Sequence, residues 1–356
     1  MKKIKRKKTK VVQIGDKKIG GDFPILVQSM TNTLTSDVEK TVKQIKRLER
    51  AGCEIIRIGV PDLKAAKAIK EIKKRINIPL VADIHFSAAL AKEAILQGVD
   101  KIRINPGNFP KSELKEVVNL AKEKNIPIRV GVNAGSLEKD LLEKYGHSSA
   151  KALAESALRN TKLLENFGFY NIVISAKASD VLRTIEVYEI LSKETDYPLH
   201  LGVTEAGGKL IGAIKSSIAL GYLLKEGIGD TIRISLSSDP VEEVKVAFEI
   251  LKNLELRKEG VQIVSCPTCS RTKIDVISIS KEIENFTKNI KQPLKIAILG
   301  CVVNGLGEGR EADLAVVGVG KNLALFMRNG KIIKKIKANK IIDLLKEEIN
   351  NLIKKS

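Results

Sequence analysis

Short apolar runs rich in β-branched residues alternate with longer amphipathic stretches over about the first 250 residues. Each run ends in polar residues, which is typical of a buried strand followed by a loop. The eight predicted strands lie at 24–30, 54–60, 79–85, 101–105, 127–133, 171–177, 198–204 and 231–237. The helices predicted between them lie at about 37–51, 62–75, 87–98, 112–124, 149–167, 180–194, 209–226 and 240–254, with Ser36 and Asp180 among the expected caps. Eight strand-helix units predict a closed parallel (β/α)8 barrel, with a doubly wound open sheet as the alternative.

The regular alternation of predicted strands and helices ends at about residue 256. Strands are expected at 261–265, 295–299 and 313–319, a helix near 275–288 and a final amphipathic helix at about 339–354. The pair Asn329-Gly330 is a strong signal for a tight hairpin turn. We therefore expect three parts: a basic disordered arm at 1–10, the barrel at 11–255 and a small α+β domain at 256–356.

Composition narrows the class of protein. Of the 356 residues 43% are hydrophobic, mean hydropathy is −0.05, and no apolar run is long enough to span a membrane. Neither a membrane segment nor a secretory signal is predicted, so a cytoplasmic location is expected. The net charge of +20 resembles a nucleic-acid signal. However, the first ten residues supply +7 of it, aromatic residues make up only 4%, and no nucleic-acid-binding module is recognisable. A multiply anionic substrate or an acidic protein partner explains the charge equally well.

Polar side chains gather at the ends of the predicted strands, where the carboxyl ends of a parallel barrel form one mouth. The candidate residues at this mouth are Arg57, Asp83, His85, Arg103, Asn105, Arg129, Asn133, Ser175, Lys177, Thr204, Glu205, Arg233 and Ser235. The chain has 48 lysines but only 14 arginines, so four arginines inside apolar strands are unlikely to be accidental. A guanidinium binds phosphate in a bidentate manner, which predicts a substrate with several negative charges. The alternative is that each arginine pairs with a neighbouring acid.

The acidic candidates have their own alternatives. Asp83 and His85 lie on one face of a strand, where they could contact substrate hydroxyls or simply plug the end of the barrel. Glu205, in a turn with Gly207 and Gly208, could act as an acid or base or hold a hydroxyl group.

Three of the four cysteines lie in the second domain. Cys266 and Cys269 form a C-x2-C pair, and Cys301 opens a glycine-rich loop that ends at Glu308. Zinc would need a fourth ligand, and all three histidines (85, 147 and 200) are in the barrel region. An iron-sulfur cluster fits better, with its fourth iron bound weakly by Glu308 or left open. A redox-active dithiol and buried free cysteines remain alternatives. Cys53 is expected in the core.

Several longer motifs also resemble a known family, the 4-hydroxy-3-methylbut-2-enyl diphosphate synthases of the non-mevalonate isoprenoid pathway, in their bacterial two-domain form. The matching runs are VQSMTNT (27–33), VADIHF (81–86), RINPGN (103–108), RVGVNAGSLEKD (129–140), LGVTEAGG (201–208), GIGDTIRISLSSDPVEE (227–243), CPTCSRT (266–272) and GCVVNG-x-GE (300–308). They extend over nearly the whole chain, from about residue 11 to about 320. Leu306 departs from the family, which usually has proline there, and this puts the rigidity of the loop in question.

The resemblance implies a TIM barrel followed by a [4Fe-4S] domain, in a homodimer where the cluster of one subunit covers the barrel mouth of the other. The implied reaction is the two-electron reductive ring opening and dehydration of 2-C-methyl-D-erythritol 2,4-cyclodiphosphate, with flavodoxin or ferredoxin as electron donor. Cys266, Cys269 and Cys301 match the cluster thiolates, Glu308 a displaceable fourth ligand, and Glu205 an acid beside the reacting carbons. The residues that match the diphosphate-binding set are Arg57, Arg103, Asn105, Arg129, Asn133, Lys177, Arg233 and Ser235; Asp83, His85 and Thr204 complete the expected substrate site.

Two other functions are compatible with parts of the sequence. A non-catalytic iron-sulfur electron carrier would leave the polar strand ends unexplained. A cluster-free barrel enzyme, for example one that binds a pterin diphosphate, would leave the three cysteines to zinc or a disulfide.

Overall fold

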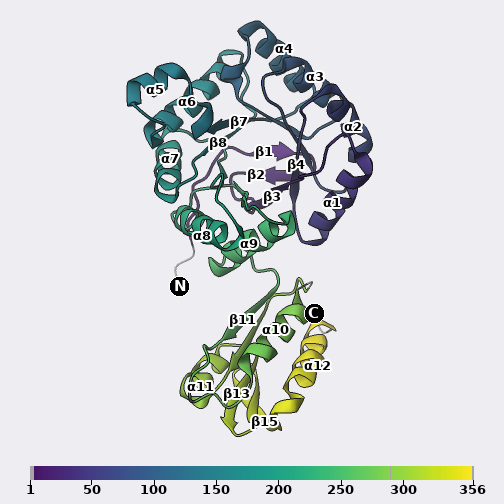
Figure 1. Ribbon diagram of the computed structural model, residues 1–356, viewed down its shortest axis with the longest axis vertical. Helices are drawn as coiled ribbons and strands as arrows, with labels where there is room; N and C mark the ends of the chain where they lie inside the picture. Colours follow the sequence, from purple (N-terminus) through teal and green to yellow (C-terminus); the bar gives the residue numbers. More distant parts are fainter. Residues whose placement is uncertain (1–3, 289, 355–356) are drawn as a thin grey trace. The chain divides into compact units, whose positions relative to one another are not determined.

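The computed structural model describes residues 4–288 and 290–354 (Figure 1). The chain divides into two compact units, the first ending at Arg257 and the second beginning at Lys258. This division lies within a few residues of the boundary expected at 255/256, where the regular alternation ends. Each unit has its own hydrophobic core.

The first unit is built on eight parallel strands. In spatial order the sheet runs β8-β7-β6-β5-β4-β3-β10-β9, and a parallel bridge between Ile174 and Leu199 joins the two ends of this row. The predicted closed barrel is therefore confirmed, and the open doubly wound sheet is wrong. The strands are β3 (Leu26–Met30), β4 (Ile55–Gly59), β5 (Leu80–Asp83), β6 (Lys101–Ile104), β7 (Ile128–Asn133), β8 (Ile172–Lys177), β9 (His200–Leu201) and β10 (Thr231–Ile232).

A ring of helices surrounds the strands (Figure 1). These are α1 (Val38–Arg50), α2 (Leu63–Lys73), α3 (Ala88–Leu96), α4 (Lys111–Glu123), α5 (Lys139–Tyr145), α6 (Ala150–Asn166), α7 (Val181–Glu194), α8 (Lys209–Lys225) and α9 (Pro240–Asn253), with short 3-10 turns at Pro106–Asn108 and Ala134–Ser136. The side chain of Asp180 caps α7 as predicted, by accepting from the Arg183 N–H. Helix α1 is capped by Asp37 rather than by Ser36. The short helix α5 was not predicted.

A small hairpin closes the amino-terminal end of the barrel. Strands β1 (Val12–Ile14) and β2 (Lys17–Ile19) pair antiparallel. Their buried side chains form one apolar cluster with inward-facing residues of the barrel strands, among them Ile55 and Val81. We call this cluster the floor of the barrel; its members are Val12, Ile14, Ile19, Leu26, Ile55, Val81 and Val173. The floor separates the barrel interior from solvent at this end.

The basic arm was predicted to be disordered, and for its described residues 4–10 this prediction is wrong. The Lys7 N–H donates to the Gly227 carbonyl at 2.9 Å, and the Lys10 N–H donates to the Asp196 carbonyl at 2.7 Å. Arg6 Nη2 lies 2.9 Å from Asp230 Oδ1, a carboxylate that is almost fully buried. The arm is held because the loops before β9 and β10 offer it carbonyls and a buried acid. The remaining part of the predicted arm, 1–3, lies outside the described residues.

The second unit is a five-stranded sheet with helices on both faces (Figure 1). Its elements are β11 (Val261–Ser265), α10 (Val276–Thr287), β12 (Leu294–Leu299), α11 (Val302–Arg310), β13 (Leu314–Gly320), β14 (Leu323–Arg328), β15 (Lys331–Lys337), a 3-10 turn at Ala338–Lys340 and α12 (Ile341–Lys354). Strands β11, β12 and β13 are parallel, and β13, β14 and β15 are antiparallel. Asn329 and Gly330 both have positive φ, as the predicted hairpin turn requires.

The segment that was predicted to be a glycine-rich loop, 300–308, forms helix α11 from Val302 onward, so that prediction is wrong. The glycines allow the helix to approach the sheet closely: a Cβ at Gly305 would overlap Val317, and one at Gly309 would lie 2.8 Å from Met327 Sδ. Leu306 packs on the same apolar cluster. Leu306, at the position where the family usually has proline, is therefore part of a helix that packs against the sheet.

Candidate functional site

The interior of the barrel above the floor is lined by charged side chains. Because side chains alternate along a strand, residues in register with the floor residue Val81 point inward, and so do residues two positions further along. Lys101 pairs with Val81, Arg103 with Asp83 and Arg129 with Arg103. The predicted substrate residues that the structure brings into this interior are Arg57, Asp83, Arg103, Arg129, Asn133, Lys177 and Arg233.

Asp83 is the hub of the contacts in the interior. Its Oδ1 lies 3.1 Å from Arg103 Nη1 and its Oδ2 lies 3.7 Å from Arg57 Nη1. Burial alone would raise the pKa of Asp83, but the charge of Arg57, a hydrogen bond from His85 and the charges of Arg103 and Arg129 hold it well below its usual value. Asp83 is therefore a permanent carboxylate that orients two guanidinium groups. The suggestion that arginines pair with acids holds for Arg57 and Arg103.

Two other interior cations, Arg129 and Lys177, form no ion pair with an acid among the described residues. Arg129 is almost completely buried, and its Nε and Nη1 have no hydrogen-bond partner among the described residues. Lys177 is also buried. Burial, together with the charges of the neighbouring arginines, lowers the pKa of Lys177 well below its usual value. An anionic ligand would supply the charge partner that these two buried side chains lack among the described residues, because an unpaired buried charge is costly.

Arg233 and Ser235 lie at the end of β10. Arg233 Nη2 is 3.6 Å from Glu243 Oε1, while Arg233 Nε and Ser235 Oγ are buried without a partner in the part of the chain that the structure describes. Glu243, on α9, also accepts from Ser29 Oγ at 3.0 Å and from the Leu236 N–H at 3.1 Å. Glu243 thus holds the Arg233 side chain in place, while Arg233 Nε and Ser235 Oγ stay available as donors to a ligand.

Two glycines make room for the interior cations. A Cβ at Gly131 would overlap the Arg103 guanidinium, and a Cβ at Gly202 would overlap the Lys177 ammonium. Neither position has a positive φ, so their role is space rather than backbone conformation. The strands lack side chains at the points where long cationic side chains cross the barrel.

The remaining predicted residues lie at or near the rim. Asn105 is buried, and its Oδ1 has no hydrogen-bond partner among the described residues. Thr204 is half-buried, and Glu205 and His85 are exposed. His85 Nε2 is 2.7 Å from Arg103 Nη1. A cavity of about 540 Å³ opens beside Asp83 and His85, between the loops that follow β3 and β4. Glu205 has a φ of +44°, an uncommon conformation for a residue with a side chain.

The three cysteines of the second unit lie at one end of its sheet. Cys266 directly follows β11 and Cys301 follows the neighbouring parallel strand β12. The Gly300 N–H donates to Cys266 Sγ at 3.0 Å. Cys269 is exposed, and a hydrogen bond from the Arg271 backbone lowers its pKa. Cys53, by contrast, is buried in the barrel core, and burial raises its pKa to about 12.

The candidate donors of the second unit are the thiols of Cys266, Cys269 and Cys301 and the carboxylate of Glu308. Within residues 4–288 and 290–354, no three His, Cys, Asp or Glu side chains converge closely enough to bind one ion. Cys301, the N-cap of α11, and Glu308 are seven residues apart, which places them on the same helix face, about 10 Å apart along the axis. Sulfur donors favour iron-sulfur chemistry, so the three thiols are compatible with the expected cluster.

Sequence reasoning missed four residues that lie in the barrel interior or beside it. Glu243 was missed because it lies on helix α9, whereas the candidate residues were sought at the ends of strands. Met30 Sδ, 3.1 Å from Arg57 Nε, carries no charge signal. Lys101 and His200 are both fully buried and belong to the barrel strands. Lys101 could have been found, since it lies two residues before Arg103 and so shares its strand face.

The fold and the site together define a class: a (β/α)8 barrel with a cationic interior for an anionic substrate, followed by a smaller domain with three strand-end cysteines. The chain belongs to the GcpE family. The GcpE TIM-barrel domain matches residues 9–248 and the GcpE protein C-terminal domain matches residues 262–351.

Curated relatives agree over almost the whole chain. A protein of Caldanaerobacter subterraneus subsp. tengcongensis named 4-hydroxy-3-methylbut-2-en-1-yl diphosphate synthase (flavodoxin) is 59% identical over 350 residues, 98% of each chain. A protein of Clostridium perfringens with the same name is 57% identical over 343 residues, 96% of this chain and 98% of the relative. The family predicted from the motifs is confirmed.

Solved structures agree on the barrel. Dihydropteroate synthase from Yersinia pestis superposes with a TM-score of 0.51 at 15% identity, covering 69% of this chain and 97% of its own. The enzyme from Stenotrophomonas maltophilia gives the same TM-score at 14% identity, covering 69% of this chain and 98% of its own. At such identities the likeness concerns the fold alone.

Proposed function

We propose that this chain catalyses the reductive ring opening and dehydration of 2-C-methyl-D-erythritol 2,4-cyclodiphosphate to 4-hydroxy-3-methylbut-2-enyl diphosphate. The product is part of the names of the relatives described above. The observation that carries the proposal is the barrel interior, where buried cations outnumber acids and several donors have no hydrogen-bond partner within the described residues. A small molecule with two phosphate groups supplies the missing negative charge.

The proposed reaction consumes two electrons and two protons. One carbon–oxygen bond to a phosphate breaks, so the ring opens, and one hydroxyl group leaves as water. Arg57, Arg103, Arg129, Lys177 and Arg233 hold the diphosphate, with Asn105, Asn133 and Ser235 as hydrogen-bonding groups. Asp83, His85 and Thr204 contact the rest of the substrate, and Glu205 at the rim serves as an acid beside the reacting carbons.

Cys266, Cys269 and Cys301 are the proposed ligands of a [4Fe-4S] cluster, with Glu308 as the fourth ligand. Such a cluster would supply the two electrons one at a time. In support, the second unit holds three of the four cysteines at one sheet end, while the fourth, Cys53, is buried elsewhere.

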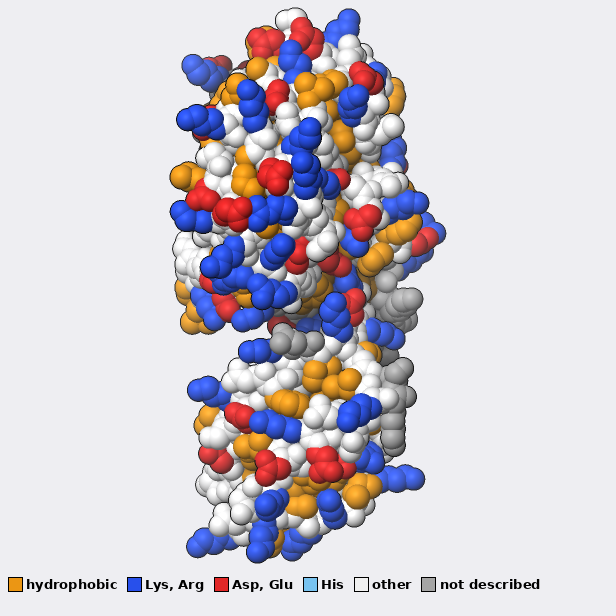
Figure 2. Space-filling view, turned by 90° about the vertical axis from the view of Figure 1, so that its right-hand side faces the viewer, with side chains coloured by type: hydrophobic (Ala, Val, Ile, Leu, Met, Phe, Trp, Pro, Cys, Tyr) orange, Lys and Arg blue, Asp and Glu red, His pale blue; other side chains and the backbone are white. Residues whose placement is uncertain are grey.

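Flavodoxin is the proposed electron donor, because the curated relatives are named as flavodoxin-dependent; ferredoxin is the alternative. A positively charged enzyme attracts an acidic carrier protein. On the face shown in Figure 2, blue and red side chains are interspersed over the barrel unit, so no continuous basic surface of the kind used for nucleic acid is visible there.

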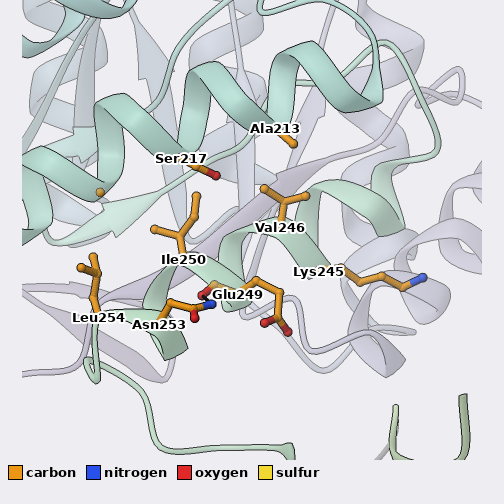
Figure 3. Close-up of a pocket in the computed structure, with 9 residues that line it drawn as sticks. Ala213, Ser217, Lys245, Val246, Glu249, Ile250, Asn253 and Leu254 are labelled. Carbon is orange, nitrogen blue, oxygen red and sulfur yellow. Dashed lines mark hydrogen bonds between the residues drawn. The ribbon is translucent and has the colours of Figure 1, made fainter. Parts of the chain in front are cut away.

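We also propose a homodimer. Helix α8 exposes a row of large apolar residues, Leu210, Ile214, Ile218 and Tyr222. A groove of about 480 Å³ runs beside this row between α8 and α9, and it is lined on the α8 side by the small residues Ala213, Ser217 and Gly221 (Figure 3). The large and the small residues each recur every four positions, so the ridge of one copy can enter the groove of a two-fold mate. That the cluster domain of one copy covers the barrel mouth of the other stays a prediction.

No helix among the described residues is long and apolar enough to cross a bilayer. A cytoplasmic location stays a prediction.

One experiment tests the proposed function. The protein is reconstituted anaerobically with iron and sulfide and assayed with the cyclic diphosphate and a strong one-electron reductant. Formation of the linear diphosphate, dependent on iron, is expected. Iron binding without turnover would favour an electron carrier, and turnover of another substrate without iron would favour a cluster-free barrel enzyme.

A further inference from the structure

We propose that Lys101 takes up a proton when a diphosphate enters the barrel, so that substrate binding and protonation of this buried lysine are coupled. The chemical nature of the anion rests on the proposed function. The role of Lys101 rests on its place in the barrel interior.

Lys101 is on the inner wall of the barrel, close to the floor. It pairs in register with Val81, a floor residue, and lies two positions before Arg103 on β6. Its side chain is completely buried, and Lys101 Nζ has no hydrogen-bond partner within the described part of the chain. A buried ammonium without a partner is costly, and in proteins such a lysine avoids the cost by losing its proton.

The charged groups of the interior disfavour a positive charge on Lys101. The neighbouring strands present Arg57 on β4, Arg129 on β7, Lys177 on β8 and Arg233 after β10, and Arg103 lies on β6 itself. The acids in or behind this wall are Asp83 and Glu243, which already contact arginines. His200 on β9 is a further titratable group, and the buried Tyr188 of α7 donates from its hydroxyl to the His200 carbonyl at 2.6 Å. Strands β3 and β10 add the neutral side chains of Gln28 and Thr231.

Among these cations, a lysine is the group that can give up charge. A guanidinium stays protonated in proteins, whereas a lysine shifts its pKa readily when buried. Burial, with the charges of Arg129 and Arg57, lowers the pKa of Lys101 well below its usual value. A diphosphate above Lys101 would reverse the sign of the local potential, and its several negative charges would favour the ammonium form.

Two other groups could bind the proton instead. His200 is buried with Nδ1 2.8 Å from Thr231 Oγ1 and Nε2 unpartnered among the described residues. Its pKa is lowered by burial and by the charge of Arg129. Lys177 lies nearer the mouth, where contact with phosphate is part of the proposed function. Substitution of Lys101 alone separates its contribution from theirs.

Coupling gives the binding constant a definite pH dependence. Where Lys101 is neutral in the free protein and charged in the complex, one proton is bound per ligand. The affinity then falls about tenfold for each unit of rising pH, by linkage. Without Lys101 this part of the slope disappears.

Isothermal titration calorimetry of the anaerobic holoprotein tests the proposal. The titrants are the cyclic diphosphate and, separately, inorganic pyrophosphate. Each is measured in two buffers of equal pH and different ionisation enthalpy, which gives the number of protons taken up. Lys101→Met is compared with the wild type and with the control Lys67→Met, which removes an exposed lysine of α2. Lys101→Met should take up about one proton less, and the control should match the wild type.

The outcomes separate the two claims. Binding without proton uptake by the wild type, or equal uptake by Lys101→Met and wild type, would overturn the role of Lys101 and leave the proposed function intact. If neither diphosphate binds, both claims fail. A second neutral variant, Lys101→Gln, replaces the methionine variant if that protein does not fold, and the pH slope of the wild type requires no variant.

Discussion

The Arg103 guanidinium occupies the space that a side chain at position 131 would fill. Arg103 crosses from β6 toward β7, donates from Nη2 to the Gly131 carbonyl at 3.1 Å and holds Asp83 with Nη1. Because a Cβ on residue 131 would overlap the Arg103 guanidinium, a single methyl group can displace one of the proposed phosphate ligands.

Gly131→Ala should therefore raise the KM for the cyclic diphosphate while the barrel stays folded. Losing a charge-assisted contact costs about 1.5–3 kcal/mol, or roughly a ten- to hundredfold change. Steady-state kinetics and thermal melting measure the two effects. The control is a double-mutant cycle: in an Arg103→Ala background the glycine substitution should add little. Additive effects in that cycle would show that Gly131 acts through something other than Arg103.

Much of this architecture could be predicted from the sequence because it depends on local patterns. Alternation along the strands placed Arg57, Arg103 and Arg129 on one interior wall, and parallel strands put their ends at one mouth. The same periodicity applies to Lys101, whose charge was not associated with the site because it precedes the strand end.

Other features could not be predicted because they depend on tertiary contacts. Strands β1 and β2 have three residues each, too few for a clear alternating pattern. They are stabilised by packing against the barrel strands in the floor cluster. The arm at 4–10 has the composition of a disordered segment, and it is held by Asp230 and by backbone carbonyls. The glycines of α11 are typical of a loop and led to that prediction. In the structure Gly305 and Gly309 face the sheet and allow close packing of the helix against it.

Cys301→Ala should remove most of the iron from the reconstituted protein, because a cluster with two remaining thiolates is poorly held. The matched control is Cys53→Ala, which removes a buried thiol that donates to the Ile55 carbonyl at 3.1 Å and should leave iron content unchanged. Iron and sulfide analysis with the visible absorption spectrum measures the difference. Full iron retention in Cys301→Ala, or stoichiometric zinc in the wild type, would contradict the proposed ligand set.

Arg6→Ala should destabilise the barrel, since it leaves the buried Asp230 carboxylate without its cation. The expected loss is about 1.5–3 kcal/mol in the free energy of unfolding at neutral pH, measured by chemical denaturation. Lys8→Ala is the control, because Lys8 and its partner Asp22 are both largely exposed and such pairs contribute little.

The loss in Arg6→Ala should also depend on pH. Burial raises the pKa of Asp230, against the opposing effects of the Leu199 N–H and of Arg6, and removing Arg6 raises that pKa further. A raised carboxyl pKa in the folded state makes stability fall as pH rises above the unfolded value of about 3.9. The difference between variant and wild type should therefore shrink toward pH 4. A difference that stays constant across this range would assign the effect to packing.

Ile218→Glu should convert the proposed dimer into a monomer, because it places a charge in the middle of the apolar row on α8 that would be buried against the mate. Sedimentation or light scattering at several protein concentrations measures the mass. Tyr170→Glu, at another exposed apolar position, should leave the dimer intact. A monomeric wild type, or an unaffected dimer in Ile218→Glu, would rule out this face as the interface.

Glu308→Gln should keep its iron but lose most of its turnover. Glu308 lies on α11, seven residues after Cys301, and it is the proposed fourth ligand beside the three thiolates. Three thiolates suffice to hold the metal, so iron content should be retained. An amide is a weaker ligand than a carboxylate and has no proton to give to a departing hydroxyl.

The matched control is Glu311→Gln. The Glu311 carboxylate lies at the end of the same helix, 3.5 Å from Lys295 Nζ, and this variant should turn over normally. Iron analysis, steady-state rates and electron paramagnetic resonance spectra with and without substrate distinguish the possibilities. Full activity of Glu308→Gln, with spectra that match the wild type in both states, would reduce Glu308 to a surface residue of α11 and leave the three cysteines as the only protein ligands.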